Sequence, residues 1–154
     1  MDPEPAPAQR PSSAGSLILL LGLLDFVVSS FLPFASIDTM TTREFSFFQM
    51  ATSARDTGVA TVGAYLYLFA GVGVLAALAV IAHRGGATWT VGALAGGTAV
   101  WSVTWVGILL GVLGLATPIR LAYWMLLVSI AVVVAGAILV WIADRRMRSR
   151  PFPA

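Results

Sequence analysis

Residues 121–143 read LAYWMLLVSIAVVVAGAILVWIA and contain no charged side chain. A helix needs about 20 mostly apolar residues to cross the ~30 Å hydrocarbon layer of a bilayer, so this stretch is long enough to span one. Residues 57–82 and 85–119 also lack charges, and the stretch 16–32, SLILLLGLLDFVVSSFL, contains only one, Asp25. The sequence therefore predicts four membrane-spanning helices, at about 16–33, 58–82, 88–115 and 119–143.

The composition excludes an ordinary soluble domain. The chain has 154 residues, of which 58% are hydrophobic and 10% are charged, whereas a soluble domain is about 25% charged. Inside a bilayer the backbone must satisfy its own hydrogen bonds, which leaves helices or closed barrels. Barrel strands alternate apolar and polar residues over about ten positions, but these runs are apolar on all sides. We therefore expect an all-α integral membrane protein with a single membrane domain.

The connections between the predicted helices determine their arrangement. Residues 83–86 (HRGG) and 116–118 (ATP) are so short that the helices on either side of each must be antiparallel neighbours. An up-down four-helix transmembrane bundle over residues 16–143 follows, with one larger loop at 34–57. Because Asp25 interrupts its apolar core, the first helix is expected to be retained rather than removed as a signal peptide.

Both termini are expected on the cytoplasmic side. Basic residues near the ends of spans favour the cytoplasm, and a cytoplasmic N-terminus places six of the nine basic residues there. These six are Arg10, Arg84, Arg145, Arg146, Arg148 and Arg150, against Arg43, Arg55 and Arg120 outside. The four C-terminal arginines should face anionic lipid headgroups rather than nucleic acid. This topology predicts a flexible, Pro-rich cytoplasmic tail at 1–15, a basic cytoplasmic tail at 144–154 and an extracytoplasmic loop at 34–57.

Asp25 is the candidate functional residue, because it lies roughly 12 Å inside its apolar run at 1.5 Å per residue. A carboxylate at the centre of a bilayer costs roughly 2.5–3.5 kcal/mol on insertion scales. No basic residue lies at a similar depth, and burial without a counter-ion favours the neutral acid. We therefore expect Asp25 to be largely protonated at neutral pH and to donate a hydrogen bond to a hydroxyl or carbonyl. The predicted intramembrane polar site comprises Asp25, Ser29, Tyr67, Thr98, Trp101, Ser102 and Ser129.

Three roles for Asp25 remain open at this point. It could join two helices as a structural latch, it could titrate as a proton or cation site, or it could pair with a basic residue of a partner protein. The second role would make the chain a small proton- or cation-coupled transporter. Such a transporter would have to work as an oligomer, because four tightly packed helices enclose little space.

The third predicted helix carries a stripe of glycines with two GxxxG pairs, Gly92 with Gly96 and Gly107 with Gly111. At about 100° per residue, the two pairs point in nearly the same direction. Glycines of this spacing allow close helix approach in membranes, so we expect the stripe to pack against a neighbour within the bundle or, alternatively, against a second chain. Trp101 and Trp105 lie on the opposite side of this helix. They either fill space or form an indole wall beside a polar site.

The loop at 34–57 interleaves charged residues with the aromatic residues Phe45, Phe47 and Phe48. The spacing of Phe45 and Phe47 is typical of a short strand, whereas residues 46–54 could form one or two turns of interfacial helix. The aromatic side chains either rest at the level of the lipid headgroups or form a docking surface for a partner protein. The sequence does not decide between these alternatives.

Little in the chain supports catalysis. Cysteine is absent, His83 is the only histidine, and there is no HExxH motif, phosphate-binding glycine loop or second intramembrane acid. We therefore expect a small polytopic membrane protein that is not an enzyme and has no metal or cofactor. Its partners would be the lipid bilayer and other membrane proteins or copies of itself, in an accessory, assembly or scaffold role. The absence of lysine beside abundant Arg, Ala, Val and Gly is typical of GC-rich bacterial genomes, so we expect a bacterial cell (inner or plasma) membrane.

Overall fold

The computed structural model describes residues 13–33, 35–37, 43–46, 59–84, 88–113 and 120–149. Within these residues the chain forms four α-helices and one two-stranded antiparallel sheet. The helices are α1 (Ser13–Ser30), α3 (Val59–His83), α4 (Thr88–Leu113) and α5 (Leu121–Arg148), and the strands are β1 (Ala35–Ile37) and β2 (Arg43–Phe45). The chain is therefore predominantly helical, as its composition predicts. Two segments, Trp89–Gly111 in α4 and Leu121–Arg148 in α5, are long and apolar enough to cross a membrane.

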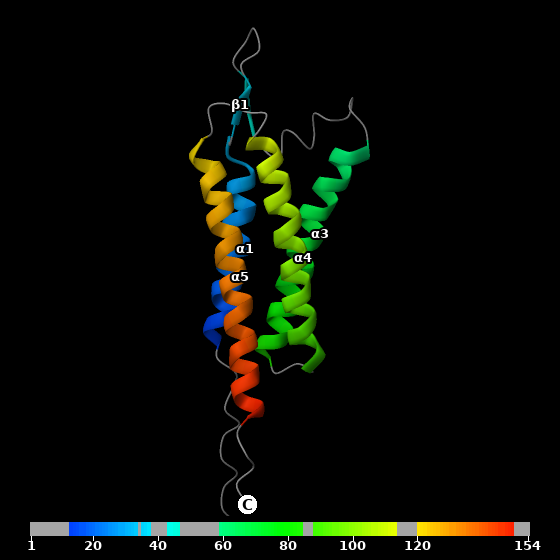
Figure 1. Ribbon diagram of the computed structural model, residues 1–154, viewed down its shortest axis with the longest axis vertical. Helices are drawn as coiled ribbons and strands as arrows, with labels where there is room; N and C mark the ends of the chain where they lie inside the picture. The colour runs from blue at the N-terminus through cyan, green and yellow to red at the C-terminus, as the bar shows by residue number, and fades with distance from the viewer. Residues whose placement is uncertain are drawn as a thin grey trace, which may run out of the picture.

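The four helices run along one common axis, and successive helices point in opposite directions (Figure 1). The most extensive contact joins α1 to α5, the first and last helices in the chain. Smaller contacts join α5 to α4, α4 to α3, and α3 back to α1. The N-terminal end of α3 leans away from the other helices (Figure 1). As a result, α1 and α5 form a closely packed pair beside the more open pair α3 and α4.

Two helix ends lie outside the predicted bounds. Helix α1 begins at Ser13, inside the predicted tail at 1–15, and α5 continues to Arg148, inside the predicted tail at 144–154. Arg148 forms an ion pair with Asp144 one turn earlier. Such pairs, together with basic residues near a helix C-terminus, stabilise the last turn of a helix. Residues 144–148 of the predicted basic tail are therefore helical.

The predicted loop at 34–57 contains the two strands. Ala35 lies opposite Phe45 in their antiparallel register, so a short strand ends at Phe45 as its spacing predicts. The alternative helix at 46–54 lies outside the described residues except for Ser46. Phe47 and Phe48 lie outside the described residues, and so does the side chain of Phe45. The docking surface that was predicted from these aromatic residues stays a prediction.

The close contact between α1 and α5 depends on three buried glycines. A Cβ atom built on Gly136 would lie 2.5 Å from the backbone nitrogen of Leu19, and one built on Gly22 would lie 2.9 Å from the backbone nitrogen of Val133. A Cβ built on Gly15 would similarly lie 2.8 Å from the backbone nitrogen of Val140. No side chain fits at these distances, so glycine is required for the two backbones to approach this closely.

The predicted role of the α4 glycine stripe within the bundle is wrong. Gly92, Gly96, Gly107 and Gly111 are all exposed, and a Cβ built on any of them would meet nothing within 4 Å. The inward face of α4 is occupied by larger side chains instead, including Trp101 and Trp105, which are each 2% exposed. The spacing correctly predicted that the glycines lie on one face of the helix. It did not indicate whether that face packs against a neighbouring helix. Packing of the stripe against a second chain remains a prediction.

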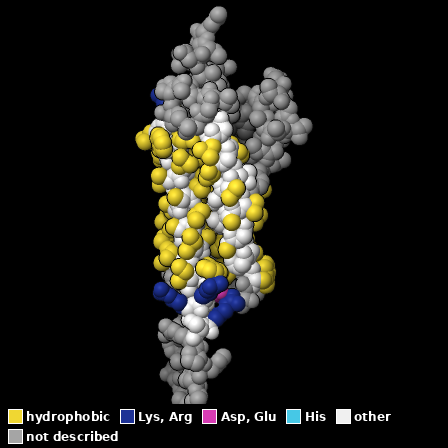
Figure 2. Space-filling model, in the orientation of Figure 1, with side chains coloured by type: hydrophobic (Ala, Val, Ile, Leu, Met, Phe, Trp, Pro, Cys, Tyr) yellow, Lys and Arg dark blue, Asp and Glu magenta, His cyan; other side chains and the backbone are white. Residues whose placement is uncertain are grey.

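The outer surface of the helices is covered by large apolar side chains (Figure 2). Every helix contributes exposed residues, for example Leu21 on α1, Val74 on α3, Val103 on α4 and Val128 on α5. In Figure 2 the arginine side chains gather at the ends of the helices, below and above this apolar band. On the face that Figure 2 shows, the described helices therefore present an apolar band with arginines beyond it. Within the described helices, Asp25 is the one acidic or basic residue away from the helix ends.

Candidate functional site

Asp25 and Ser129 meet at the contact between α1 and α5. The Ser129 hydroxyl lies 2.5 Å from Oδ2 of Asp25, which is hydrogen-bonding distance, although the two residues are 104 positions apart in the chain. Ser129 is completely buried, and Asp25 is partly buried. The sequence predicted both residues as members of one polar site, and the fold brings them together as the only hydrogen-bonded pair of that set in the described part of the chain.

Ser129 also lies within hydrogen-bonding distance of a second acceptor. Its hydroxyl oxygen is 2.7 Å from the backbone carbonyl oxygen of Met125, one turn earlier on α5. A serine hydroxyl carries a single proton, so it cannot donate fully to Met125 and to an ionised Asp25 at the same time. The Ser129 hydroxyl therefore shares its proton between the Asp25 carboxyl oxygen and the Met125 carbonyl oxygen.

No cation lies beside Asp25 among the described side chains. The ionisable residues that the structure describes on the other helices are His83, Arg84, Arg120 and the group from Asp144 to Arg148, all at helix ends. The described residues also contain no group of three His, Cys, Asp or Glu side chains that could hold a metal ion. Within the described residues, Asp25 therefore has the Ser129 hydroxyl as a polar partner and no ion-pair partner.

An aromatic cluster lies immediately beside the Asp25–Ser129 pair. Phe26 packs edge-on between Trp101 and Trp105 of α4, with ring centroids 4.7 Å and 5.2 Å apart. The Trp101 ring also covers Gly71 of α3, where an added Cβ would lie 2.7 Å from Cδ1 of the indole. The two tryptophans therefore fill the space between α1, α3 and α4, as one of the two sequence interpretations predicts.

Several other members of the predicted polar site are buried but do not join Asp25. Hydroxyl groups of Ser29, Thr98 and Ser102, and the indole nitrogen of Trp101, have no hydrogen-bond partner among the described residues. The Tyr67 side chain lies outside the described part of the chain. Of the seven residues predicted to form the site, the structure thus joins only Asp25 and Ser129 by a hydrogen bond within the described residues. Other members on α1 and α4 are buried polar groups without a hydrogen-bond partner there.

Sequence reasoning missed the Met125 carbonyl and the close approach of Gly15 and Gly136 to the backbone of the opposite helix. A signal for the glycines was present, because small residues recur every seven positions on both helices. On α1 they are Gly15, Gly22 and Ser29, and on α5 they are Ala122, Ser129 and Gly136, all of them buried. A seven-residue repeat of small side chains produces a narrow seam along which two helices approach closely.

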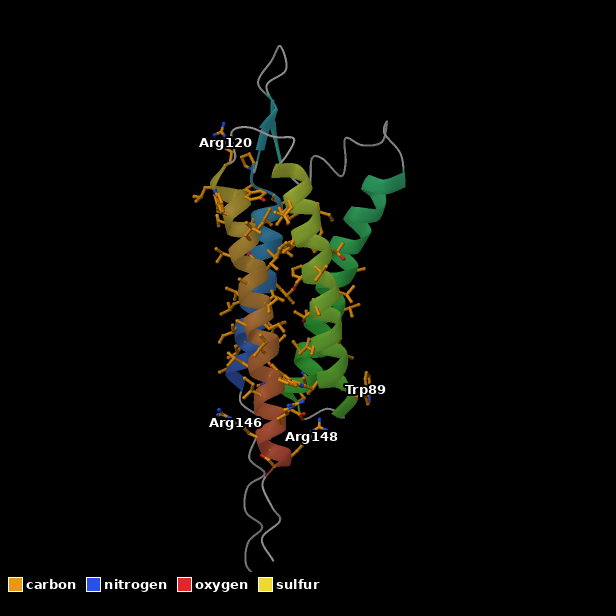
Figure 3. The ribbon with its side chains drawn as sticks, in the orientation of Figure 1. Trp89, Arg120, Arg146 and Arg148 are labelled. Carbon is orange, nitrogen blue, oxygen red and sulfur yellow. The ribbon has the colours of Figure 1, made fainter. Side chains whose placement is uncertain are left out.

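The predicted arginine cluster is largely within the described residues. The Arg145 guanidinium group lies 3.9 Å from the centre of the Trp141 ring, and Arg148 pairs with Asp144. Arg146 and Arg148 extend to different sides of α5 (Figure 3). Arg150 lies outside the described part, and contact of this cluster with lipid headgroups stays a prediction.

Comparison of the chain with protein-family models, with curated proteins and with solved structures found no match.

Proposed function

We propose that this chain is an integral membrane protein that crosses a bacterial cell membrane four times, with both termini in the cytoplasm. We further propose that it has no catalytic chemistry and acts as an accessory, assembly or scaffold component of a larger membrane complex. The observation that carries the proposal is the exposed apolar band around the helices. Monomeric soluble proteins rarely expose contiguous apolar patches larger than a few hundred Å², so this surface requires lipid or protein partners.

The distribution of tryptophan supports the bilayer as one partner. Trp89, Trp124 and Trp141 are 67%, 55% and 40% exposed and lie near helix ends. Along α5, the rise from residue 124 to residue 141 is about 25 Å at 1.5 Å per residue, close to the ~30 Å hydrocarbon thickness. Exposed tryptophans at that separation are typical of the aromatic belts at the two membrane interfaces.

The polar pair supports a structural role for Asp25. Its hydrogen-bonding capacity is used within the fold, where it links α1 to α5 through Ser129. A protonated carboxyl group that donates to Ser129 is a latch between two helices and needs no substrate. The test is the infrared carboxyl band of the protein in native-like membranes. We expect a protonated band at neutral pH that disappears in Asp25→Asn, and an ionised band would contradict the latch.

The absence of cysteine allows a clean test of the topology, because any introduced thiol is unique. Ser149 and Arg120 are exposed at opposite ends of α5. In intact cells, a membrane-impermeant thiol reagent should label Arg120→Cys and should label Ser149→Cys only after the membrane is opened. The reverse pattern would invert the topology, and recovery of the protein in the soluble fraction after carbonate extraction would reject the membrane assignment.

The accessory role is tested by purification from native membranes in mild detergent. We expect the full chain to co-purify with another membrane protein in a fixed ratio, and to lose that partner when the contact surface is altered. Recovery of the chain alone, at every expression level down to the native one, would argue against this role. Turnover of a substrate by the isolated chain would reject the non-enzymatic assignment.

One observation favours a second candidate function, a proton- or cation-coupled transporter that works as an oligomer. Asp25 is only partly buried, so part of its side chain would be free to line a path between copies in an oligomer. The two functions differ in their response to Asp25→Asn, which keeps the size of the side chain and removes titration. Loss of a pH-dependent flux in vesicles with unchanged stability would favour transport over the latch.

A further inference from the structure

An open apolar groove of about 540 Å³ runs between α4 and α5. On α5 it is lined by Leu127, Ala131, Val134 and Ile138, and on α4 by Ser102 and Val106 among others. Its lining is almost entirely apolar, and it opens to the outside of the bundle. Ser102 contributes a buried hydroxyl group that has no hydrogen-bond partner among the described residues.

The groove points along α5 toward a basic group. Residues 127, 131, 134 and 138 are spaced by three and four positions and therefore share one face of the helix. The same spacing continues to Trp141 and Arg145. At about 100° per residue, Arg145 points in the same direction as Leu127, five turns further along, whereas Arg146 points about 100° away. On α5 the groove lining ends at Ile138. The stacked Trp141–Arg145 pair, whose guanidinium group lies 3.9 Å from the indole centre, lies on the same face of α5 in the next two turns.

Arg145 differs from its neighbours in its charge environment. Arg148 is paired with Asp144, whereas Arg145 has no carboxylate partner in the part of the chain that the structure describes. Figure 3 shows Arg148 extending toward the lower end of α4 and Arg146 extending to the opposite side of α5. The face of α5 that continues beyond the groove therefore carries a positive charge, which stacks on an aromatic ring and has no acidic partner among the described side chains.

We propose that this groove binds one acyl chain of an anionic phospholipid whose phosphate group is held by Arg145. The length agrees, because α5 rises about 16 Å from Val134 in the groove to Arg145 at 1.5 Å per residue, and one leaflet contributes about half of the ~30 Å hydrocarbon core. The charge agrees, because an anionic headgroup beyond the groove complements Arg145. An apolar partner helix could fill the groove but would not neutralise the charge of Arg145. An anionic lipid does both, because its acyl chain fills the groove and its phosphate group pairs with the guanidinium group.

This proposal rests on the proposed membrane insertion, and its test separates the two. The full chain is purified in a zwitterionic detergent, and its binding of phosphatidylglycerol and of phosphatidylcholine is measured by native mass spectrometry. Arg145→Gln should weaken phosphatidylglycerol binding by about fivefold, the change expected from ~1 kcal/mol per basic residue at a membrane surface. Arg146→Gln is the matched control and should change binding less than twofold.

A second pair of variants tests the groove itself. Ala131→Phe fills the groove with a ring, whereas Ala99→Phe adds the same ring to the exposed outer face of α4. Only Ala131→Phe should reduce phosphatidylglycerol binding, and both variants should keep the circular dichroism spectrum of the parent. The proposal is overturned if both arginine variants weaken binding equally, if phosphatidylcholine binds as well as phosphatidylglycerol, or if Ala131→Phe has no effect. Any of these outcomes with correct labelling of Ser149→Cys rejects the lipid site alone, whereas incorrect labelling rejects the membrane topology on which the site depends.

Discussion

The contact between α1 and α5 and the outer face of α4 are both rich in glycine, yet glycine serves opposite purposes in them. At the α1–α5 contact, Gly15, Gly22 and Gly136 are buried, and an added Cβ would meet backbone atoms of the other helix. On the outer face of α4, Gly92 and Gly107 are exposed and have nothing within 4 Å. A glycine pattern therefore indicates that another helix could approach closely. The surrounding side chains determine whether a helix of the same chain packs there.

The two regions also differ in their polar groups. The close approach at the α1–α5 contact allows Ser129 to reach Asp25 at 2.5 Å. On α4, Thr104 donates to the Val100 carbonyl of its own helix at 2.9 Å, a bond that links no second helix. We therefore expect substitutions at the first region to change stability strongly and equivalent substitutions at the second to change it little.

The largest effect is expected from Gly136→Ala. Its Cβ would lie 2.5 Å from the nitrogen and 2.7 Å from Cα of Leu19, so the backbone of α1 would have to move. Overpacking of a close contact typically costs 1–3 kcal/mol, and we expect about 3 kcal/mol here because backbone cannot yield as a side chain can. Unfolding by SDS titration in mixed micelles measures the change, and a variant as stable as the parent would contradict the packing of α1 on α5.

A smaller loss is expected from Gly71→Ala, between α3 and α4. Its Cβ would lie 2.7 Å from Cδ1 of Trp101, but the indole is a side chain and can rotate away. We expect a loss of about 1–2 kcal/mol, together with a change in the near-ultraviolet circular dichroism of the tryptophans. Gly73→Ala, two positions further along α3 with nothing within 4 Å, is the matched control and should leave the spectrum unchanged.

The polar pair should contribute less than the glycine contact. Interhelical hydrogen bonds in membranes average about 0.6 kcal/mol and reach about 1.7 kcal/mol, so Ser129→Ala should lower the free energy of unfolding by an amount in this range. Ser29→Ala is the control, because Ser29 is equally buried and its hydroxyl has no partner among the described residues. Equal losses in the two variants would show that the Ser129 hydroxyl contributes nothing specific to the link with Asp25.

Most of the helical architecture could be predicted from the sequence, because uncharged stretches of about 20 residues or more have few alternatives to the helix. The short connections between these stretches predicted that successive helices are antiparallel. The ends were less predictable, since the ion pair between Asp144 and Arg148 lies in a part of α5 beyond the uncharged stretch that set its predicted end. A strand at Arg43–Phe45 remained one of two alternatives, because three residues carry too short a pattern to decide.

The candidate site was predicted in its chemistry and not in its geometry. A lone Asp25 in an apolar run indicated a hydrogen-bonded acid, and Ser129 stood among the expected donors. Asp25 bonds to Ser129 rather than to Ser102 because α1 packs most closely against α5. The uniformly apolar residues of the spans give no periodic pattern that would indicate which helices are neighbours. The seven-residue repeat of Gly15, Gly22 and Ser29 contains this information, whereas the more conspicuous GxxxG pairs on α4 directed attention to the exposed face.

The smallest effect is expected from Gly107→Ala on the outer face of α4. This variant tests an exposed glycine, whereas Gly136→Ala tests a buried one. Alanine is a better helix former than glycine, and an exposed Cβ that meets nothing gives no opposing strain, so we expect a stabilisation of a few tenths to ~1 kcal/mol. The same variant tests whether the stripe binds a second chain, because close packing between copies would be weakened by the added methyl group. Analytical ultracentrifugation in detergent separates the two cases. An unchanged association state with equal or greater stability fits a face turned toward lipid, whereas dissociation of an oligomer would assign the α4 glycines the same role between chains that Gly136 has within one.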